Sequence, residues 1–124
     1  HFNAVNAVAV YVPHNADSPA LAITASDDCT LIAWELKSGK KIKVFTEGHY
    51  NRVTALAVYN PPAEENATPL LISTSADQST IVWNLLTLKK ARVIKGHSDA
   101  VNALAIYAPS AMLITGSDDF TANV

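Results

Sequence analysis

Residues 49–59 read HYNRVTALAVY, and similar stretches occur at 1–11 (HFNAVNAVAVY) and at 97–107 (HSDAVNALAIY). Because these copies begin at residues 1, 49 and 97, the spacing between them is 48 residues both times. A second block follows each copy: ITASDDCTLIAW at 23–34, ISTSADQSTIVW at 72–83 and ITGSDDFTANV at 114–124. Self-similarity at a period of this length indicates one structural unit copied along the chain, here about 2.6 times.

Within the unit, the apolar pattern has a period of two rather than 3.6. Residues 53–59 alternate between two apolar faces, and residues 70–75 and 80–83 are short β-branched runs bounded by turn residues. The basic segment 89–95 carries apolar residues among its charges, as a half-exposed strand does. No segment has the pattern of an amphipathic helix. The pattern therefore predicts four β-strands in each complete unit, which we label a to d.

The four strands repeat at corresponding positions in each unit. We predict strand a at 5–11, 53–59 and 101–107, strand b at 21–26, 70–75 and 112–117, strand c at 30–35, 79–84 and 120–124, and strand d at 40–45 and 89–95. Strand a is rich in alanine, which suits an innermost strand with little room. The a–b connections at 12–20, 60–69 and 108–111 differ most in length, as surface loops do.

The composition excludes several classes of protein. Hydrophobic residues make up 49% of the 124 residues and charged ones 16%, which argues against disorder. The net charge of −2 gives no overall attraction for nucleic acid. With Cys29 as the single cysteine, no disulfide can form within the chain, and the apolar runs are too short to cross a bilayer. We expect an intracellular, cytoplasmic protein that binds neither membranes nor nucleic acid.

Glycine, histidine, aspartate and tryptophan recur in register with the strands. The pairs Gly48-His49 and Gly96-His97 precede strand a, Asp28, Asp77 and Asp119 lie in the b–c turn, and Trp34 and Trp83 lie near the end of strand c. Over the whole chain this pattern resembles the WD-repeat family of β-propellers. The family is named after a Trp-Asp dipeptide, and the corresponding residues here are Trp-Glu and Trp-Asn, so neither copy matches it in full. The resemblance implies an all-β fold of four-stranded antiparallel blades.

The repeats also suggest how the chain is divided. We expect blade 1 at 1–47, blade 2 at 48–95 and an incomplete blade 3, with strands a to c, at 96–124. An open arc of blades exposes apolar faces, and uncapped repeat arrays are poorly soluble. We therefore expect these blades to belong to a larger closed propeller, completed by the same longer chain or by other copies.

In the WD-repeat family, a histidine, a hydroxyl residue of strand b, the turn aspartate and the tryptophan form a hydrogen-bonded network. A buried carboxylate needs donors, and an imidazole N–H and a hydroxyl can supply them. Carried over by position, the structural network comprises His1, Thr24, Asp28 and Trp34 in blade 1, His49, Ser73, Asp77 and Trp83 in blade 2, and His97, Thr115 and Asp119 in blade 3.

A serine, a histidine and an aspartate also form the triad of hydrolases. A catalytic triad occurs once and needs an exposed nucleophile, whereas this set recurs in every unit together with tryptophan. The fourth histidine, His14, lies alone in a loop, and no ligand pair has zinc-like spacing. Cys29 has no basic neighbour to activate it, and we interpret it as a packing residue or a bystander. We expect no catalytic residue, metal or cofactor.

Basic residues gather in or beside strand d. They are eight of the nine Lys and Arg residues: Lys37, Lys40, Lys41, Lys43, Lys89, Lys90, Arg92 and Lys95. Lysines on an outer strand discourage edge-to-edge pairing, and we favour this interpretation. The alternative is a basic circumference that contacts acidic partners.

Acidic residues gather at the b–c turns and the d–a loops, which share one face in a propeller. The resemblance implies that this face binds partners through residues at the start of strand a and just before the turn aspartate. The candidate face comprises Ala4, Asn6, Asp27, Glu47, Arg52, Thr54, Ala76, Asp99, Ala100, Asn102 and Asp118. Its acidic excess favours a basic peptide. Ordinary solvated turn charge is the alternative.

These observations predict a non-enzymatic protein–protein interaction scaffold that presents a loop-lined propeller face to a peptide or partner domain. The alternative is a regulatory or sensor region attached to an enzyme or signalling domain outside this chain. An enzyme in its own right would require an exposed, non-repeating cluster of polar residues. The sequence contains no pattern of that kind.

Overall fold

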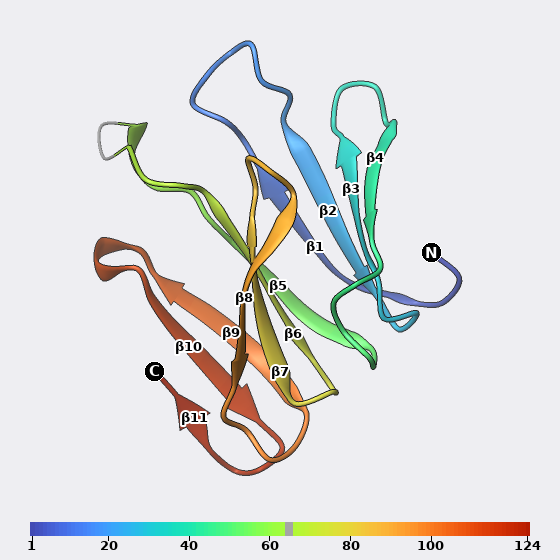
Figure 1. The fold of residues 1–124 in the computed structure, drawn as a ribbon, viewed down its shortest axis with the longest axis vertical. Helices are drawn as coiled ribbons and strands as arrows, with labels where there is room; N and C mark the ends of the chain where they lie inside the picture. Colours follow the sequence, from blue (N-terminus) through green and yellow to red (C-terminus); the bar gives the residue numbers. More distant parts are fainter. Residues whose placement is uncertain (64–65) are drawn as a thin grey trace.

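Three antiparallel β-sheets make up the computed structural model, which describes residues 1–63 and 66–124 (Figure 1). The first sheet has the strand order β1 (Val5–Tyr11), β2 (Leu21–Ser26), β3 (Leu31–Glu35) and β4 (Lys41–Phe45). The second has the order β5 (Val53–Tyr59), β6 (Leu70–Ser75), β7 (Ser79–Asn84) and β8 (Lys89–Lys95). The third contains β9 (Val101–Tyr107), β10 (Met112–Ser117) and β11 (Ala122–Asn123).

The predicted all-β class of four-stranded antiparallel sheets is confirmed, and strands a and b begin and end at the predicted residues in all three sheets. Residues 64–65, part of the predicted loop 60–69, lie outside the described residues. The described chain contains no α-helix, and none of its segments is a helix long and apolar enough to cross a membrane. A three-residue 3-10 helix, η2 (Ala108–Ser110), forms the short connection from β9 to β10.

Three predicted strands begin later than expected. Strand d of the first sheet begins at Lys41 rather than at 40, and in the other two strands turn hydrogen bonds take up the first residues. Strand c of the third sheet begins at Ala122 rather than at 120. Phe120 has a positive φ of 66°, and the N–H of Thr121 donates to the carboxylate of Asp119. In the first sheet, Thr30 donates its N–H to Asp28 in the same way, and β3 begins at Leu31.

The sheets lie side by side, with their strands a next to one another: β5 contacts both β1 and β9 (Figure 1). The main core lies between the first and second sheets, where the apolar faces of β2, β3, β6 and β7 pack. Its buried members are Tyr11, Leu21, Ile23, Ala25, Leu31, Ala33, Phe45, Val53, Leu71, Ile81, Trp83 and Leu85. Strands β4 and β8 are mostly exposed along the outer edges of their sheets.

Candidate functional site

In the second sheet, one histidine links a turn aspartate to a strand hydroxyl. The Nδ1 of His49 lies 3.0 Å from Oδ2 of Asp77 in the β6–β7 turn, and its Nε2 lies 2.8 Å from Oγ of Ser73 on β6. The indole Nε1–H of Trp83 on β7 donates to the same Ser73 oxygen at 2.9 Å. His49 is 5% exposed, Ser73 0% and Trp83 4%. The four predicted residues are therefore joined in a largely buried chain of hydrogen bonds.

These bonds define which nitrogen of His49 carries the proton. Because Ser73 Oγ accepts the indole N–H, its own proton is free to donate to Nε2 of His49. Nδ1 is then the protonated nitrogen and donates to Asp77. Burial lowers the pKa of His49 and outweighs the Asp77 carboxylate, which would raise it. A second proton would aim two N–H donors at one buried Ser73 oxygen, so His49 stays neutral at pH 7.

The turn aspartate of this sheet is held by its neighbours in sequence. Burial alone would raise the pKa of Asp77, but the hydroxyl of Ser79 and the backbone N–H groups of Tyr50 and Ser79 donate to its carboxylate and bring the pKa below its usual value. The Ser79 hydroxyl bond measures 2.5 Å and the Tyr50 N–H bond 2.9 Å. Asp77 therefore stays ionised, and its carboxylate holds the start of β7 at Ser79 and the segment before β5 at Tyr50.

The first sheet repeats this arrangement. His1 Nδ1 lies 3.0 Å from Oδ2 of Asp28, and its Nε2 lies 2.7 Å from Oγ1 of Thr24. The indole of Trp34 donates to Thr24 at 2.9 Å. Burial would raise the pKa of Asp28, but the Thr30 hydroxyl and three further hydrogen bonds outweigh it and lower the pKa.

The third sheet contains the same links without an indole. His97 Nδ1 lies 2.9 Å from Oδ2 of Asp119, and its Nε2 lies 2.9 Å from Oγ1 of Thr115. The hydroxyl of Thr121 donates to Asp119 at 2.5 Å, and this bond is the largest influence lowering the pKa of that carboxyl. All eleven predicted network residues are thus brought together in three sets.

Two serine or threonine positions belong to each set but are missing from the sequence prediction. One is the last residue of strand b, whose hydroxyl oxygen accepts the N–H of the turn aspartate: Ser26, Ser75 and Ser117. The other lies two residues after that aspartate and donates its hydroxyl to it: Thr30, Ser79 and Thr121. Both recur in register at 49- or 42-residue intervals, so the recurrence of a hydroxyl residue was the signal that could have revealed them.

Each strand a carries a β-bulge next to its first residue, in its pairing with strand b. The pairing with strand b shifts between Val5 and Ala7, between Val53 and Ala55, and at the corresponding place in β9. The extra residues are Asn6, Thr54 and Asn102, all of which belong to the predicted face. A bulge re-aims the side chain of its extra residue, and here that side chain lies at the end of the sheet that carries the b–c turn.

The bulged side chains connect adjacent sheets. Asn6 Nδ2 donates to the carbonyl of Val53 at 3.1 Å, and the Thr54 hydroxyl donates to the carbonyl of Val101 at 2.5 Å. Asn6 also donates to Asp27 at 2.5 Å. In the third sheet, the amide of Asn102 donates to Asp118. Residues of strand a and of the b–c turn that belong to the predicted face therefore contact one another directly.

Backbone bonds hold three further pairs of the predicted face at the same ends of the sheets. The N–H groups of Asp27, Ala76 and Asp118 donate to the carbonyls of Ala4, Arg52 and Ala100, at 2.9, 3.1 and 3.0 Å. Ala100 is 7% exposed, so its side chain offers little surface to a ligand. Asp99 accepts the N–H of Ala100 at 2.7 Å. Glu47 instead lines a groove between β4 and β8.

Two other sequence interpretations concern Cys29 and metal ions. Burial raises the pKa of the Cys29 thiol, and the carboxylates of Asp28, Asp77 and Asp27 raise it further, so the thiol is protonated at neutral pH. Across residues 1–63 and 66–124, no group of three or more His, Cys, Asp or Glu side chains could hold a metal ion.

The fold and the recurring network define a repeat protein of the β-propeller class. The family described as "WD domain, G-beta repeat" matches this chain at residues 39–84 and 88–124, which together cover more than half of it. The chain therefore belongs to the WD40 family, as the glycine-histidine and tryptophan positions predict.

Curated relatives lie within the same family. The chain is 29% identical to a guanine nucleotide-binding protein subunit beta of Zea mays, over 92% of this chain and 29% of the relative. It is 26% identical to the corresponding subunit of Saccharomyces cerevisiae, over 82% of this chain and 24% of that protein. It is 28% identical to pre-mRNA-processing factor 19 of Bos taurus, over 78% of this chain and 18% of that protein. The chain thus spans less than a third of the length of these relatives.

Proposed function

We propose that this chain is part of a protein–protein interaction scaffold and that the b–c turn face binds a basic peptide. The observation that carries the proposal is the repeated junction of strand-a bulges with b–c turns. Because Asn6 and Thr54 bond to the next sheet, the polar groups at these ends are held in fixed relative positions. Fixed groups lose little entropy on binding, which favours affinity.

The charge of this face supports a basic ligand. Asp118 and Asp99 are exposed, Asp27 is half-buried, and Arg52 is the basic residue among the predicted face residues. The carboxylates of Asp27 and Asp118 accept hydrogen bonds from neutral amides, which orient them without cancelling their charge. An oriented negative charge attracts a cationic side chain and fixes its register.

We also propose that the His, hydroxyl and Asp sets are structural rather than catalytic. A nucleophile must reach its substrate, but Ser73 is fully buried and already bonded to His49 and Trp83. The same set occurs in each of the three sheets. Repetition and burial together favour a role in holding the b–c turn against the start of strand a.

The proposal is tested by fluorescence anisotropy with a labelled nine-residue Lys/Arg peptide and the full chain. Asp118→Lys should weaken binding about fivefold, because it replaces an attraction at the rim with a repulsion. Arg52→Glu should strengthen binding by a similar factor. The matched control is Asp17→Lys in the β1–β2 loop, at the opposite ends of the strands, which should change the affinity little. If all three variants bind the peptide like the unmodified chain, the proposed face is wrong.

A further inference from the structure

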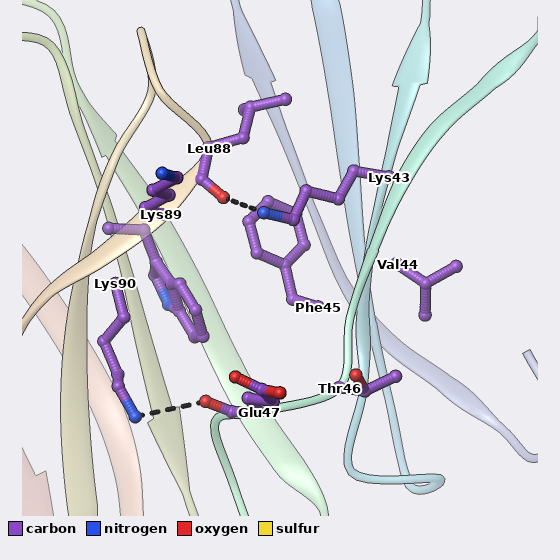
Figure 2. A pocket seen from close by; sticks show the side chains of 9 residues that line it. Lys43, Val44, Phe45, Thr46, Glu47, Leu88, Lys89 and Lys90 are labelled. Carbon is purple, nitrogen blue, oxygen red and sulfur yellow. Dashed lines mark hydrogen bonds between the residues drawn. The ribbon is translucent and has the colours of Figure 1, made fainter.

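A groove of about 480 Å³ lies between the outer strands of the first two sheets. Figure 2 shows its two sides: residues 43–47, from β4 and the segment after it, and Leu88 to Lys90, from the turn before β8 and its first two residues. Its base is aromatic, since Phe45 and Trp83 meet edge to face with ring centroids 5.0 Å apart. Both residues are 4% exposed. We call this feature the β4–β8 groove.

Three lysines and one glutamate line the β4–β8 groove. Two of the ammonium groups cross it, as the dashed lines in Figure 2 show. The Nζ of Lys43 donates to the carbonyl of Leu88 at 2.5 Å, and the Nζ of Lys90 donates to the carbonyl of Glu47 at 3.1 Å. These bonds hold the cationic groups at the groove rather than leaving them free in solvent.

The lysine charges are not neutralised by ion pairs. Within the part of the chain that the structure describes, every ion pair joins a histidine to an aspartate, and none involves a lysine or arginine. The acceptors of Lys43 and Lys90 are neutral carbonyls. Each ammonium therefore keeps its full charge and spare N–H donors. The groove is a concave site of net positive charge, because three lysines and one glutamate line it.

Protection of strand edges does not account for this arrangement. Edge protection requires only that lysines stand along an outer strand and repel another strand. It gives no reason for Lys43 and Lys90 to bridge two different sheets. Nor does it give a reason for Lys89 to line the same groove. The geometry instead concentrates three cations around one depression.

We propose that the β4–β8 groove binds a linear acidic peptide. Aspartate or glutamate side chains of that peptide would accept hydrogen bonds from Lys43, Lys89 and Lys90. An apolar side chain between them would pack on Leu88 and the methylene stems of the lysines. Apart from Glu47, no residue that lines the groove belongs to the predicted b–c turn face, so one chain carries an acidic and a basic recognition surface.

An acidic peptide fits this groove better than single-stranded nucleic acid does. Proteins that bind unpaired bases stack them on exposed aromatic rings. Here Phe45 and Trp83 face each other and are almost fully buried, so they offer no stacking surface.

The test uses the full chain and a fluorescein-labelled twelve-residue peptide of Asp and Glu with a central Leu. Lys89→Gln/Lys90→Gln should weaken its binding about fivefold or more, measured by fluorescence anisotropy. The matched control is Lys37→Gln/Lys95→Gln, which removes the same charge from residues outside the groove and should weaken binding less than twofold. Circular dichroism shows whether both variants are folded. Lys89→Gln alone, which removes no hydrogen bond in the described residues, should weaken binding about twofold.

Three outcomes would overturn the proposal. Equal weakening by the groove variant and by its control would mean that binding follows overall charge. Undiminished binding of a peptide with Asn and Gln in place of the acids would mean that carboxylates are not recognised. Tighter binding of a twelve-nucleotide oligouridine than of the acidic peptide would assign the groove to nucleic acid instead.

Discussion

The second and third sheets contain the same histidine, hydroxyl and aspartate, yet they differ in what covers them. In the second sheet, the hydrogen bonds of His49 to Asp77 and to Ser73 are 3.0 and 2.8 Å long. In the third sheet, the hydrogen bonds of His97 to Asp119 and to Thr115 are both 2.9 Å long. The second sheet adds an indole and a fourth strand, whereas in the third the hydroxyl and imidazole have neither. The hydrogen bonds therefore assemble the turn, and the tryptophan and outer strand add burial.

The largest expected effect comes from removing the indole of the second sheet. Trp83→Ala should lower the free energy of unfolding by about 3–5 kcal/mol, because it empties a buried ring site beside Phe45 and removes the donor to Ser73. Guanidinium denaturation followed by circular dichroism measures the loss. The matched change Trp34→Ala, at a less buried indole, should cost clearly less. Equal losses would mean that burial does not distinguish the sheets.

The glycine before the histidine should matter only where the indole is present. A Cβ at Gly48 would lie 2.7 Å from Cη2 and 2.9 Å from Cζ2 of Trp83, and the buried ring has no room to retreat. Gly48→Ala should therefore destabilise the chain by about 1–3 kcal/mol. At Gly96 the nearest atom is Nδ2 of Asn123, 3.3 Å away on an exposed side chain. Gly96→Ala should cost about 0.5 kcal/mol or less in the same denaturation measurement.

Titration of His49 should make the second sheet sensitive to mild acid. Burial lowers its folded-state pKa below the unfolded value of 6.5, so the unfolded chain takes up the proton first. The contribution of neutral His49 to the free energy of unfolding is fully present above pH 6.5. It is lost as the pH falls through 6.5 toward the folded-state pKa, by at most about 1.4 kcal/mol per pH unit. Urea denaturation at pH 7.5, 6.5 and 5.5 measures this slope.

The histidine variant completes that experiment. His49→Gln should be less stable at pH 7.5 but should show a flatter pH dependence than the unmodified chain. Above pH 5 the contribution of Asp77 stays constant, because its lowered pKa lies below the ordinary value of 3.8. An unchanged slope in His49→Gln would contradict the assignment of the titration to this side chain.

The smallest effect concerns a feature that the two sheets share. Gln78 and Phe120, each following the network aspartate, have positive φ angles of 73° and 66°. Glycine removes the cost of this conformation but loses more entropy on folding. Gln78→Gly and Phe120→Gly should each raise the free energy of unfolding by about 0.5 kcal/mol, measured by urea denaturation. Gains of different size would show that the turns are less alike than their dihedral angles indicate.

The sequence predicted the strands well because both the repeat and the period-two pattern mark them. Strands a and b were predicted to the residue, as with 53–59 and 70–75. The end of the chain was predicted less well, because residues 120–121 continue the β-like pattern while their backbone forms the turn around Asp119. Periodicity reports the alternation of apolar and polar side chains and carries no information on whether a residue has a positive φ.

The candidate site was predicted in part for a similar reason. The network histidines and aspartates recur in register with the strands, so the resemblance to the WD-repeat family could be carried over to them position by position. The bulges at Asn6 and Thr54 could not be read from the sequence, because they depend on a one-residue mismatch between paired strands. The β4–β8 groove was also beyond reach, since Lys43 and Leu88 are 45 residues apart and meet only when two sheets pack.

The strand-a bulges have an evolutionary consequence. Thr54 both stands on the proposed recognition face and clamps its sheet to the carbonyl of Val101. A mutation selected there for a new ligand would also loosen the junction between neighbouring blades. Adaptation of the face should therefore proceed more freely at Arg52, whose contacts to β6 and the following turn use only its backbone carbonyl. Diversification would then be uneven across the face, with the clamp residues the slowest to change.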